Sequence, residues 1–169
     1  MEHVAGSATG TVVGAGGSAV VSSGGTANAL VLEGGSALVM SGGTFSGATI
    51  SGGTLEVASG AIAMLSSVTF DSGTLVLDDA KFRGKIANFN SVDPDAIDLR
   101  TVAYGSSTTS SYVDNGASGT LIVSDGTHTA RLAILGSYAA GNFHLATDGQ
   151  GGTRITDPVV DSGTIASPH

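Results

Sequence analysis

The residues best suited to chemistry in this sequence are three aspartates that lie close together, Asp93, Asp95 and Asp98. Carboxylate oxygens are the ligands that calcium prefers, and paired carboxylates can act as acid and base in glycoside cleavage. The turn glycine and the bidentate glutamate of an EF-hand loop are absent. The stretch DGQGGTRIT at residues 148–156 has its glycines in the wrong frame for the calcium-binding nonapeptide repeat. We therefore expect these aspartates to stabilise turns, with no metal site and no cofactor.

Two histidines, His128 and His144, fall on expected strands and are the next candidates. His144 could pair with Asp148, but a dyad without an activated nucleophile is a weak catalytic signal. We expect both histidines to be exposed strand residues. The GAGG stretch at residues 14–17 lacks the lysine and the following helix of a phosphate-binding loop.

The first half of the chain has almost no charge. From residue 4 to residue 70, Glu33 and Glu56 are the only charged residues, and they fall on different repeats. The aspartates of the second half stand mostly at turn signals such as Asp93-Pro94 and Asp148-Gly149. Catalysis by side chains needs groups within hydrogen-bond reach of substrate and tuned by their neighbours. We therefore expect no enzymatic activity and no catalytic residues.

The overall composition and charge also argue against a nucleic-acid-binding protein. The 169 residues include 27 glycines, 12% charged residues and no cysteine, and the net charge is −8. An acidic chain makes a nucleic-acid partner unfavourable, because binding phosphates needs clustered basic residues. The one local basic cluster is Lys81, Arg83 and Lys85, which we expect to be a solvated strand edge. The sequence shows no membrane span and no signal peptide. Either export uses another signal or the chain is a piece of a longer protein, and we expect the second.

Paired glycines recur at a fixed spacing. Successive pairs are separated by 8, 10, 8 and 10 residues, so the repeat is 18 residues long, and the pairs are Gly16-Gly17, Gly24-Gly25, Gly34-Gly35, Gly42-Gly43 and Gly52-Gly53. Between the pairs lie short aliphatic runs that are too short for helices and are typical of strands. A short fixed period indicates a solenoid. We predict an all-β fold, a parallel β-helix, right-handed, with two short strands per coil and a turn at each glycine pair.

The 18-residue period also predicts which side chains stack. Ala19, Ala37 and Leu55 fall in register, as do Val21, Val39 and Val57, and as do the pairs Leu30 with Ala48 and Leu32 with Ile50. Because strand side chains alternate, the intervening column of Val20, Leu38 and Glu56 should face outward.

The second half changes character, with fewer glycine pairs and more charges and aromatic residues. Residues 97–102 read as a strand after an Asp-Pro turn, and Asp125-Gly126 reads as a type I′ hairpin between strands 120–124 and 127–135. A second hairpin with a longer loop is expected at 148–152. Hairpins imply antiparallel pairing, and a solenoid needs its open edge covered. We predict a solenoid over residues 1–90 and a C-terminal antiparallel cap over 91–169. The alternative is that the coils continue, because the GTL pattern recurs.

The stretch SSGGTANALVLEGGSALVMSGGTFSGATISGGTLEV resembles the short repeats of AIDA-type autotransporter adhesins. The resemblance covers residues 6–60 and implies an exported bacterial passenger, a right-handed parallel β-helix displayed at the cell surface. Some members of that family carry heptose on Ser or Thr. The compatible positions are Ser22, Ser23, Thr26, Ser41 and Thr44, whose hydroxyls could instead satisfy backbone groups in turns.

Residues 97–158 are similar to a module that closes large secreted bacterial repeat proteins. The similarity is carried by Gly119 to Ala130, by Asp148-Gly149 and by Ile155 to Pro158. It implies export and a terminal position, and no activity.

We therefore expect a structural or adhesive β-solenoid segment of an exported bacterial protein, extracellular or at the cell surface. Its partners would be the rest of a larger parent chain and surface glycans or proteins. Two alternatives stay open: a carbohydrate-binding or carbohydrate-active β-helix fragment, and a calcium-dependent secretion or folding module.

Overall fold

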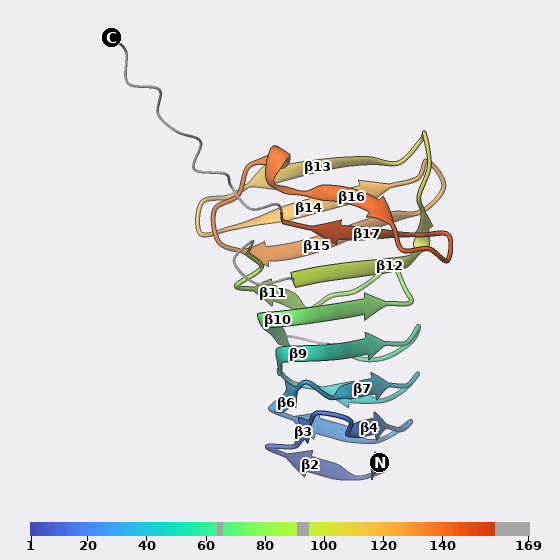
Figure 1. The fold of residues 1–169 in the computed structure, drawn as a ribbon, viewed down its shortest axis with the longest axis vertical. Helices are drawn as coiled ribbons and strands as arrows, with labels where there is room; N and C mark the ends of the chain where they lie inside the picture. Colours follow the sequence, from blue (N-terminus) through green and yellow to red (C-terminus); the bar gives the residue numbers. More distant parts are fainter. Residues whose placement is uncertain (64–65, 91–94, 158–169) are drawn as a thin grey trace.

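A computed structural model describes residues 1–63, 66–90 and 95–157. The chain winds into a β-solenoid of about five turns, as the sequence predicts. Figure 1 shows the coils stacked along the long axis, with the N-terminal coil at one end and the C-terminal strands at the other. The described residues contain no α-helix, and one short 3₁₀ turn, η1 (Ala140–Asn142), interrupts the strands.

Three walls of parallel strands enclose the solenoid interior. The first wall consists of β1 (Glu2–Val4), β4 (Ser18–Val21), β7 (Ser36–Val39), the C-terminal parts of β9 (Ala48–Val57) and β10 (Ser67–Leu77), and β12 (Asp95–Ala103). The second wall consists of β2 (Ser7–Thr9), β5 (Thr26–Asn28) and β8 (Thr44–Phe45). The third wall consists of β3 (Val12–Gly14), β6 (Leu30–Glu33), the N-terminal parts of β9 and β10, and β11 (Lys85–Ala87).

The prediction of two strands per coil is wrong for the first three coils, each of which has three strands. The corner between the second and third walls contains no glycine pair. The spacing of glycine pairs therefore could not predict it. In the coil of β4, β5 and β6 the single residue Ala29 makes this corner with a φ of 55°. A non-glycine residue in this left-handed region is uncommon, so the sequence carries little signal for it.

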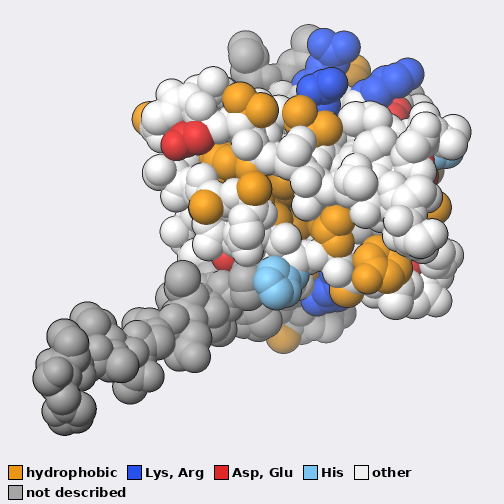
Figure 2. Space-filling model, turned by 90° about the horizontal axis from the view of Figure 1, so that it is seen from above, with side chains coloured by type: hydrophobic (Ala, Val, Ile, Leu, Met, Phe, Trp, Pro, Cys, Tyr) orange, Lys and Arg blue, Asp and Glu red, His pale blue; other side chains and the backbone are white. Residues whose placement is uncertain are grey.

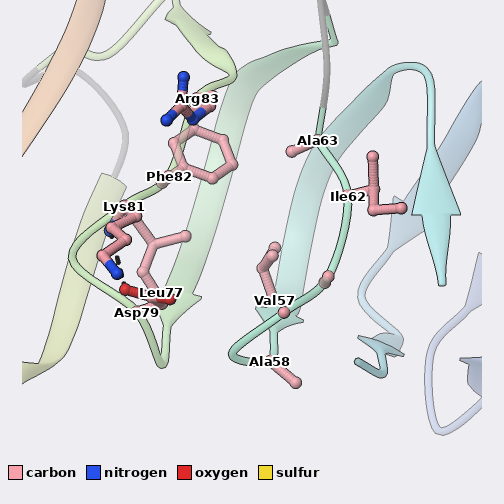
Figure 3. A pocket seen from close by; sticks show the side chains of 11 residues that line it. Val57, Ala58, Ile62, Ala63, Leu77, Asp79, Lys81, Phe82 and Arg83 are labelled. Carbon is pink, nitrogen blue, oxygen red and sulfur yellow. Dashed lines mark hydrogen bonds between the residues drawn. The ribbon is translucent and has the colours of Figure 1, made fainter. Parts of the chain in front are cut away.

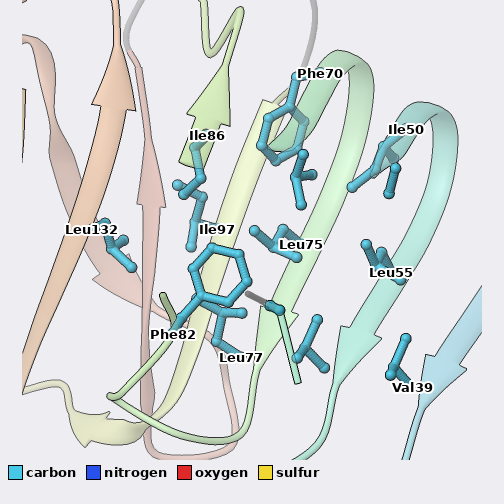
Figure 4. Close-up of a cluster of buried hydrophobic side chains, with 14 of the residues drawn as sticks. Val39, Ile50, Leu55, Phe70, Leu75, Leu77, Phe82, Ile86, Ile97 and Leu132 are labelled. Atoms are coloured by element: carbon cyan, nitrogen blue, oxygen red, sulfur yellow. The ribbon is translucent and has the colours of Figure 1, made fainter. Parts of the chain in front are cut away.

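The stacking register is as predicted. Ala19 pairs with Ala37 and Ala37 with Leu55, while Val21, Val39 and Val57 form the next column. Leu30 pairs with Ala48 and Leu32 with Ile50 on the third wall. All of these side chains are buried, and the alternating column of Val20, Leu38 and Glu56 lies half-buried on the outside. Figure 4 shows Val39, Leu55 and Leu75 following one another along the interior, where they form one continuous core.

In the first four glycine pairs the two glycines perform different tasks, as Gly24 and Gly25 show. Gly24 has a φ of 78°, which places it in the left-handed region where other residues are strained. Gly25 has an ordinary φ, but a Cβ atom there would overlap the carbonyl oxygen of Val4 in the coil below. The first glycine therefore allows the chain to turn, and the second allows the coils to approach each other.

The C-terminal strands pair with one another in antiparallel hairpins. β14 (Ser118–Ser124) pairs with β15 (Thr129–Leu135) and with β13 (Thr109–Asp114), while β16 (His144–Thr147) pairs with β17 (Gly152–Thr156). Both predicted hairpins and the strand at 97–102 are therefore confirmed. At the first hairpin the type I′ turn is wrong. Gly126 and Thr127 are the central residues, and Gly126 alone of the two has positive φ, whereas type I′ needs it at both.

These hairpins attach to the last strands of two solenoid walls. β17 pairs antiparallel with β12 at the end of the first wall, and β15 pairs in parallel with β11 at the end of the third. Parallel coil pairing therefore extends to β12, beyond residue 90. The edges of β11 and β12 are thus paired within the chain, and the outermost strands of the described cap are β13 and β16.

Candidate functional site

The three candidate aspartates do not form a site in the described residues. Asp93 lies outside them. Asp95 and Asp98 stand three residues apart on β12, so their side chains leave the strand on opposite faces. Asp95 is buried and accepts a hydrogen bond from the Asn90 backbone N–H at 3.0 Å, while Asp98 is half-buried on the outer face. In the described part of the chain no group of three His, Cys, Asp or Glu residues is placed to hold a metal ion.

Asp98 is the one candidate in an electrostatically unfavourable place. Burial raises its pKa, and the negative charge of Asp148 raises it further, while Arg100 and Arg154 partly offset this. Its Oδ1 atom is buried and has no hydrogen-bond partner in the described residues. Arg154 lies opposite Asp98 in the β12–β17 ladder. The ionised carboxylate therefore costs stability at neutral pH.

Replacing Asp98 by asparagine is expected to stabilise the protein at neutral pH. The folded-state pKa lies above the ordinary value of 3.8, so ionisation disfavours the folded state at pH 7. This penalty disappears as the pH falls through the folded-state pKa and below 3.8. Thermal melts followed by circular dichroism should show Asp98→Asn with a higher Tm than wild type at pH 7 and an equal Tm at pH 3. The exposed Glu33→Gln is the control, and an Asp98→Asn variant that melts lower at pH 7 would refute the assignment.

His144 and Asp148 do not form the dyad considered from the sequence. His144 is exposed at the start of β16, and Asp148 follows the end of that strand. The Asp148 carboxylate accepts hydrogen bonds from the backbone N–H groups of Gln150 and Gly152, at 2.6 and 2.8 Å. No contact between His144 and Asp148 is found in the described structure. Asp148 therefore stabilises its own turn.

His128 belongs to a second turn, which is organised by Asp125. The Asp125 carboxylate accepts hydrogen bonds from the backbone N–H groups of His128, Ala103 and Thr127, at 2.6, 2.9 and 2.7 Å, and its Oδ2 lies 3.2 Å from His128 Nδ1. These donors lower the pKa of Asp125, the bond from His128 most strongly. The contact with Ala103 ties the hairpin tip to the end of β12. The predicted hairpin aspartate is therefore a structural anchor.

Replacing Asp125 by asparagine should lower the Tm, because an amide accepts these hydrogen bonds with less charge and with one oxygen instead of two. The lowered folded-state pKa means that the carboxylate stabilises the protein above the ordinary value of 3.8 and loses this effect as the pH falls below it. Melts at pH 7 and pH 3 should therefore show a larger gap between wild type and variant at pH 7. Asp114→Asn, in another cap turn that holds a single backbone bond to Gly116, is the control. A gap that widens at pH 3 would contradict the linkage.

Arg100 forms ion pairs with Glu56 and Asp78 that were not predicted from the sequence. Arg100 Nη1 on β12 lies 2.7 Å from Glu56 Oε1 and 2.9 Å from Asp78 Oδ1, so it joins three successive coils of the first wall. The three side chains are 41%, 31% and 27% exposed, which makes the bridge a modest contributor to stability. The strand register predicts that Asp78 and Arg100 are neighbours. Leu77 pairs with Leu99, and each of the two charged residues directly follows one of them.

The basic cluster is only partly what the sequence suggested. Lys81, Arg83 and Lys85 are exposed, as expected of a solvated segment. Lys81 and Arg83 also flank an apolar pocket, which no sequence pattern indicated. Figure 2, which shows the cap end, has few charged side chains, mostly along one edge, among polar and apolar atoms.

The outer walls carry columns of hydroxyl groups. Ser18, Ser36, Thr54 and Thr74 follow one another in register on the first wall, and Ser7, Thr26 and Thr44 do so on the second. Ser23 and Ser41, two of the compatible glycosylation positions, are exposed, and their hydroxyls make no hydrogen bond within the described residues. At these two positions the hydroxyls therefore do not form the hydrogen bonds to turn backbone groups that were considered from the sequence.

Comparisons with protein-family models, with curated proteins and with solved structures find no match to this chain. In the described residues no helix is long and apolar enough to cross a membrane.

Proposed function

We propose that this chain is a non-catalytic structural or adhesive segment of an exported bacterial protein, displayed at the cell surface or outside the cell. The observation that carries the proposal is the pair of in-register hydroxyl columns on a stack of parallel coils. Such a surface repeats the same chemistry at each coil, at the strand spacing of about 4.8 Å. A repeating array can form many weak contacts with another surface at once. Together these contacts bind more tightly than any one of them alone.

Further support comes from the ends of the walls. The cap strands β15 and β17 pair with β11 and β12, so the last parallel strands of the third and first walls are covered within this chain. The resemblance of residues 6–60 to autotransporter adhesin repeats and of residues 97–158 to a terminal module of secreted repeat proteins points the same way. The partners would be glycans or proteins of a host or bacterial surface, and the rest of a parent chain.

Attachment of coated beads tests the adhesive role. Beads carrying the protein should attach to epithelial monolayers or to bacterial lawns well above bare beads. Removing one hydroxyl column should reduce attachment about tenfold, because the array acts through many copies; the four changes are Ser18→Ala, Ser36→Ala, Thr54→Val and Thr74→Val. The control removes four exposed hydroxyls of the cap, at Ser106, Ser107, Ser110 and Ser111, and should leave attachment unchanged. Attachment no better than bare beads, or equal loss in both variants, would defeat the proposal.

A turnover screen tests the non-catalytic part. Polysaccharides incubated with the protein, with and without calcium, should release no new reducing ends. Turnover that disappears in Asp95→Asn or Asp98→Asn would establish an enzyme instead. A calcium-dependent rise in Tm would support a calcium-dependent folding module.

A further inference from the structure

The second wall ends before the other two, and a pocket lies where it stops. In the described residues its strands are β2, β5 and β8, followed by a bridge between Thr44 and Ile62. In the next coil the corresponding segment, residues 78–84, forms no strand. The two successive coils therefore separate at this corner, and the space between them has a volume of about 310 Å³.

The described walls of the pocket are mostly apolar. Val57 and Leu77, a register pair of the first wall, form its base, and Ala61, Ala63 and Phe82 form its sides. Figure 3 shows Phe82 and Leu77 on one segment facing Ala63 and Val57 on the other. The Phe82 ring folds back over Gly84, where a Cβ atom would collide with it, so the glycine allows this ring position.

The rim of the pocket carries an excess of positive charge. Phe82 is buried, whereas its two chain neighbours, Lys81 and Arg83, are exposed, and all three line the pocket. Neither of the two cations forms an ion pair within the described residues. Among the described lining residues the carboxylate is Asp79, which accepts hydrogen bonds from Ser59 Oγ at 3.3 Å and from the Lys81 backbone N–H at 3.0 Å. The rim therefore has two cations for one anion.

We propose that this pocket binds a small amphiphilic anion, with its apolar body between the coils and its carboxylate at Lys81 and Arg83. An apolar cavity of about 150 Å³ is enough to hold benzene, so this one accommodates a body roughly twice as large. A medium-chain fatty acid has that size and a single head group. Two exposed cations at the mouth of an apolar pocket select such an anion over a neutral or cationic molecule of the same shape. The site is independent of the hydroxyl columns and of the display role.

Titration with octanoate at pH 7, followed by methyl chemical shifts in NMR, tests the site. The methyl signals of Ala61, Ala63 and Leu77 should shift saturably, with a dissociation constant of about 1 mM or tighter for a ligand of this size. Octanol should bind several-fold more weakly, and octylammonium should not saturate. Lys81→Gln and Arg83→Gln should each weaken octanoate binding about three- to tenfold, because each removes a charge-assisted contact.

Lys85→Gln is the matched control, since Lys85 is exposed four residues from Lys81 but does not line the pocket. It should change octanoate affinity less than twofold. Ala61→Phe should fill the pocket and abolish the shifts. If that variant fails to fold, the affinities of Lys81→Gln and Arg83→Gln for octanoate still test the site, because both residues are exposed. Absence of saturation at 10 mM octanoate, equal affinity for octanol, or an equal loss in Lys85→Gln would each overturn the proposal.

Discussion

Gly53→Ala is expected to destabilise the solenoid by about 3 kcal/mol or more, from a positive φ that costs other residues about 1–2 kcal/mol and from a steric clash. Gly53 lies at the corner between the third and first walls with a φ of 85°. A Cβ atom there would meet the carbonyl oxygen of Gly35, in the coil below, at a distance that no packing adjustment tolerates. The coils would have to separate at this corner, which would break the Thr54 to Gly35 backbone hydrogen bond.

Two other glycines separate these contributions. Gly116 has a φ of 93°, and a Cβ atom added there would have no neighbour within 4 Å, so Gly116→Ala should show the backbone strain alone, about 1–2 kcal/mol. Gly47 has neither positive φ nor a close neighbour, so Gly47→Ala should be neutral or stabilise by up to about 1 kcal/mol. Urea unfolding of the three variants gives the free energies. A Gly53 variant no less stable than the Gly116 variant would contradict the close stacking of coils.

Phe89→Ala is expected to cost about 3–5 kcal/mol, the range for deleting a fully buried phenylalanine. The Phe89 ring is completely buried and stands between the solenoid and the cap. Its centroid lies 5.5 Å from that of Phe70 in the last coils and 6.4 Å from that of Phe143 in the cap. The Phe89 carbonyl oxygen also accepts a hydrogen bond from the Tyr138 hydroxyl. Removing the ring would leave a cavity where these two parts of the chain meet.

Urea unfolding followed by tyrosine fluorescence and by far-ultraviolet circular dichroism measures this effect, because Tyr112 and Tyr138 report on the cap. Both signals should shift to lower urea in Phe89→Ala. The exposed Tyr104→Ala, 45% exposed and outside the aromatic cluster, should change the free energy of unfolding by no more than about 0.5 kcal/mol. A Phe89 variant as stable as that control would show that the cap does not depend on this ring.

Much of the solenoid was predictable because its rules are local and repeat. Glycine pairs fix the corners, alternation fixes the inward face, and the period then fixes the columns of Val21 and Ala19. The additional strand of the first three coils was not predicted, because its corner carries no glycine pair; in the coil of β4, β5 and β6 one residue with positive φ, Ala29, makes this corner. The hairpin positions were predictable from turn residues, but the central residues of the turn are Gly126 and Thr127, and the Asp125 carboxylate accepts the backbone N–H groups of Thr127 and His128.

The candidate site was much less predictable than the fold. The pocket at Phe82 exists because one wall stops a coil before the others, and no local pattern reports where a strand fails to form. The Arg100 bridge joins residues 44 positions apart, and it depends on coil lengths that grow from 18 residues in the middle of the stack to 22 at its end. The hydroxyl columns, in contrast, follow directly from the period. The spacing of residues in the sequence therefore predicts features that recur in every coil, such as the hydroxyl columns. It does not predict the pocket or the Arg100 ion pairs, which depend on irregular coils.

Disulfide cross-linking tests the coil register, on which the columns and the pocket depend. The chain has no cysteine, so Val20→Cys with Leu38→Cys introduces a single pair at stacked, outward positions. Adjacent strands lie about 4.8 Å apart, within the Cα separation that a disulfide accepts. Mild oxidation should join this pair within one molecule, while Val20→Cys with Val39→Cys, on opposite faces of neighbouring strands, should stay reduced. Cross-linking of the second pair in preference to the first would contradict the register of the coils.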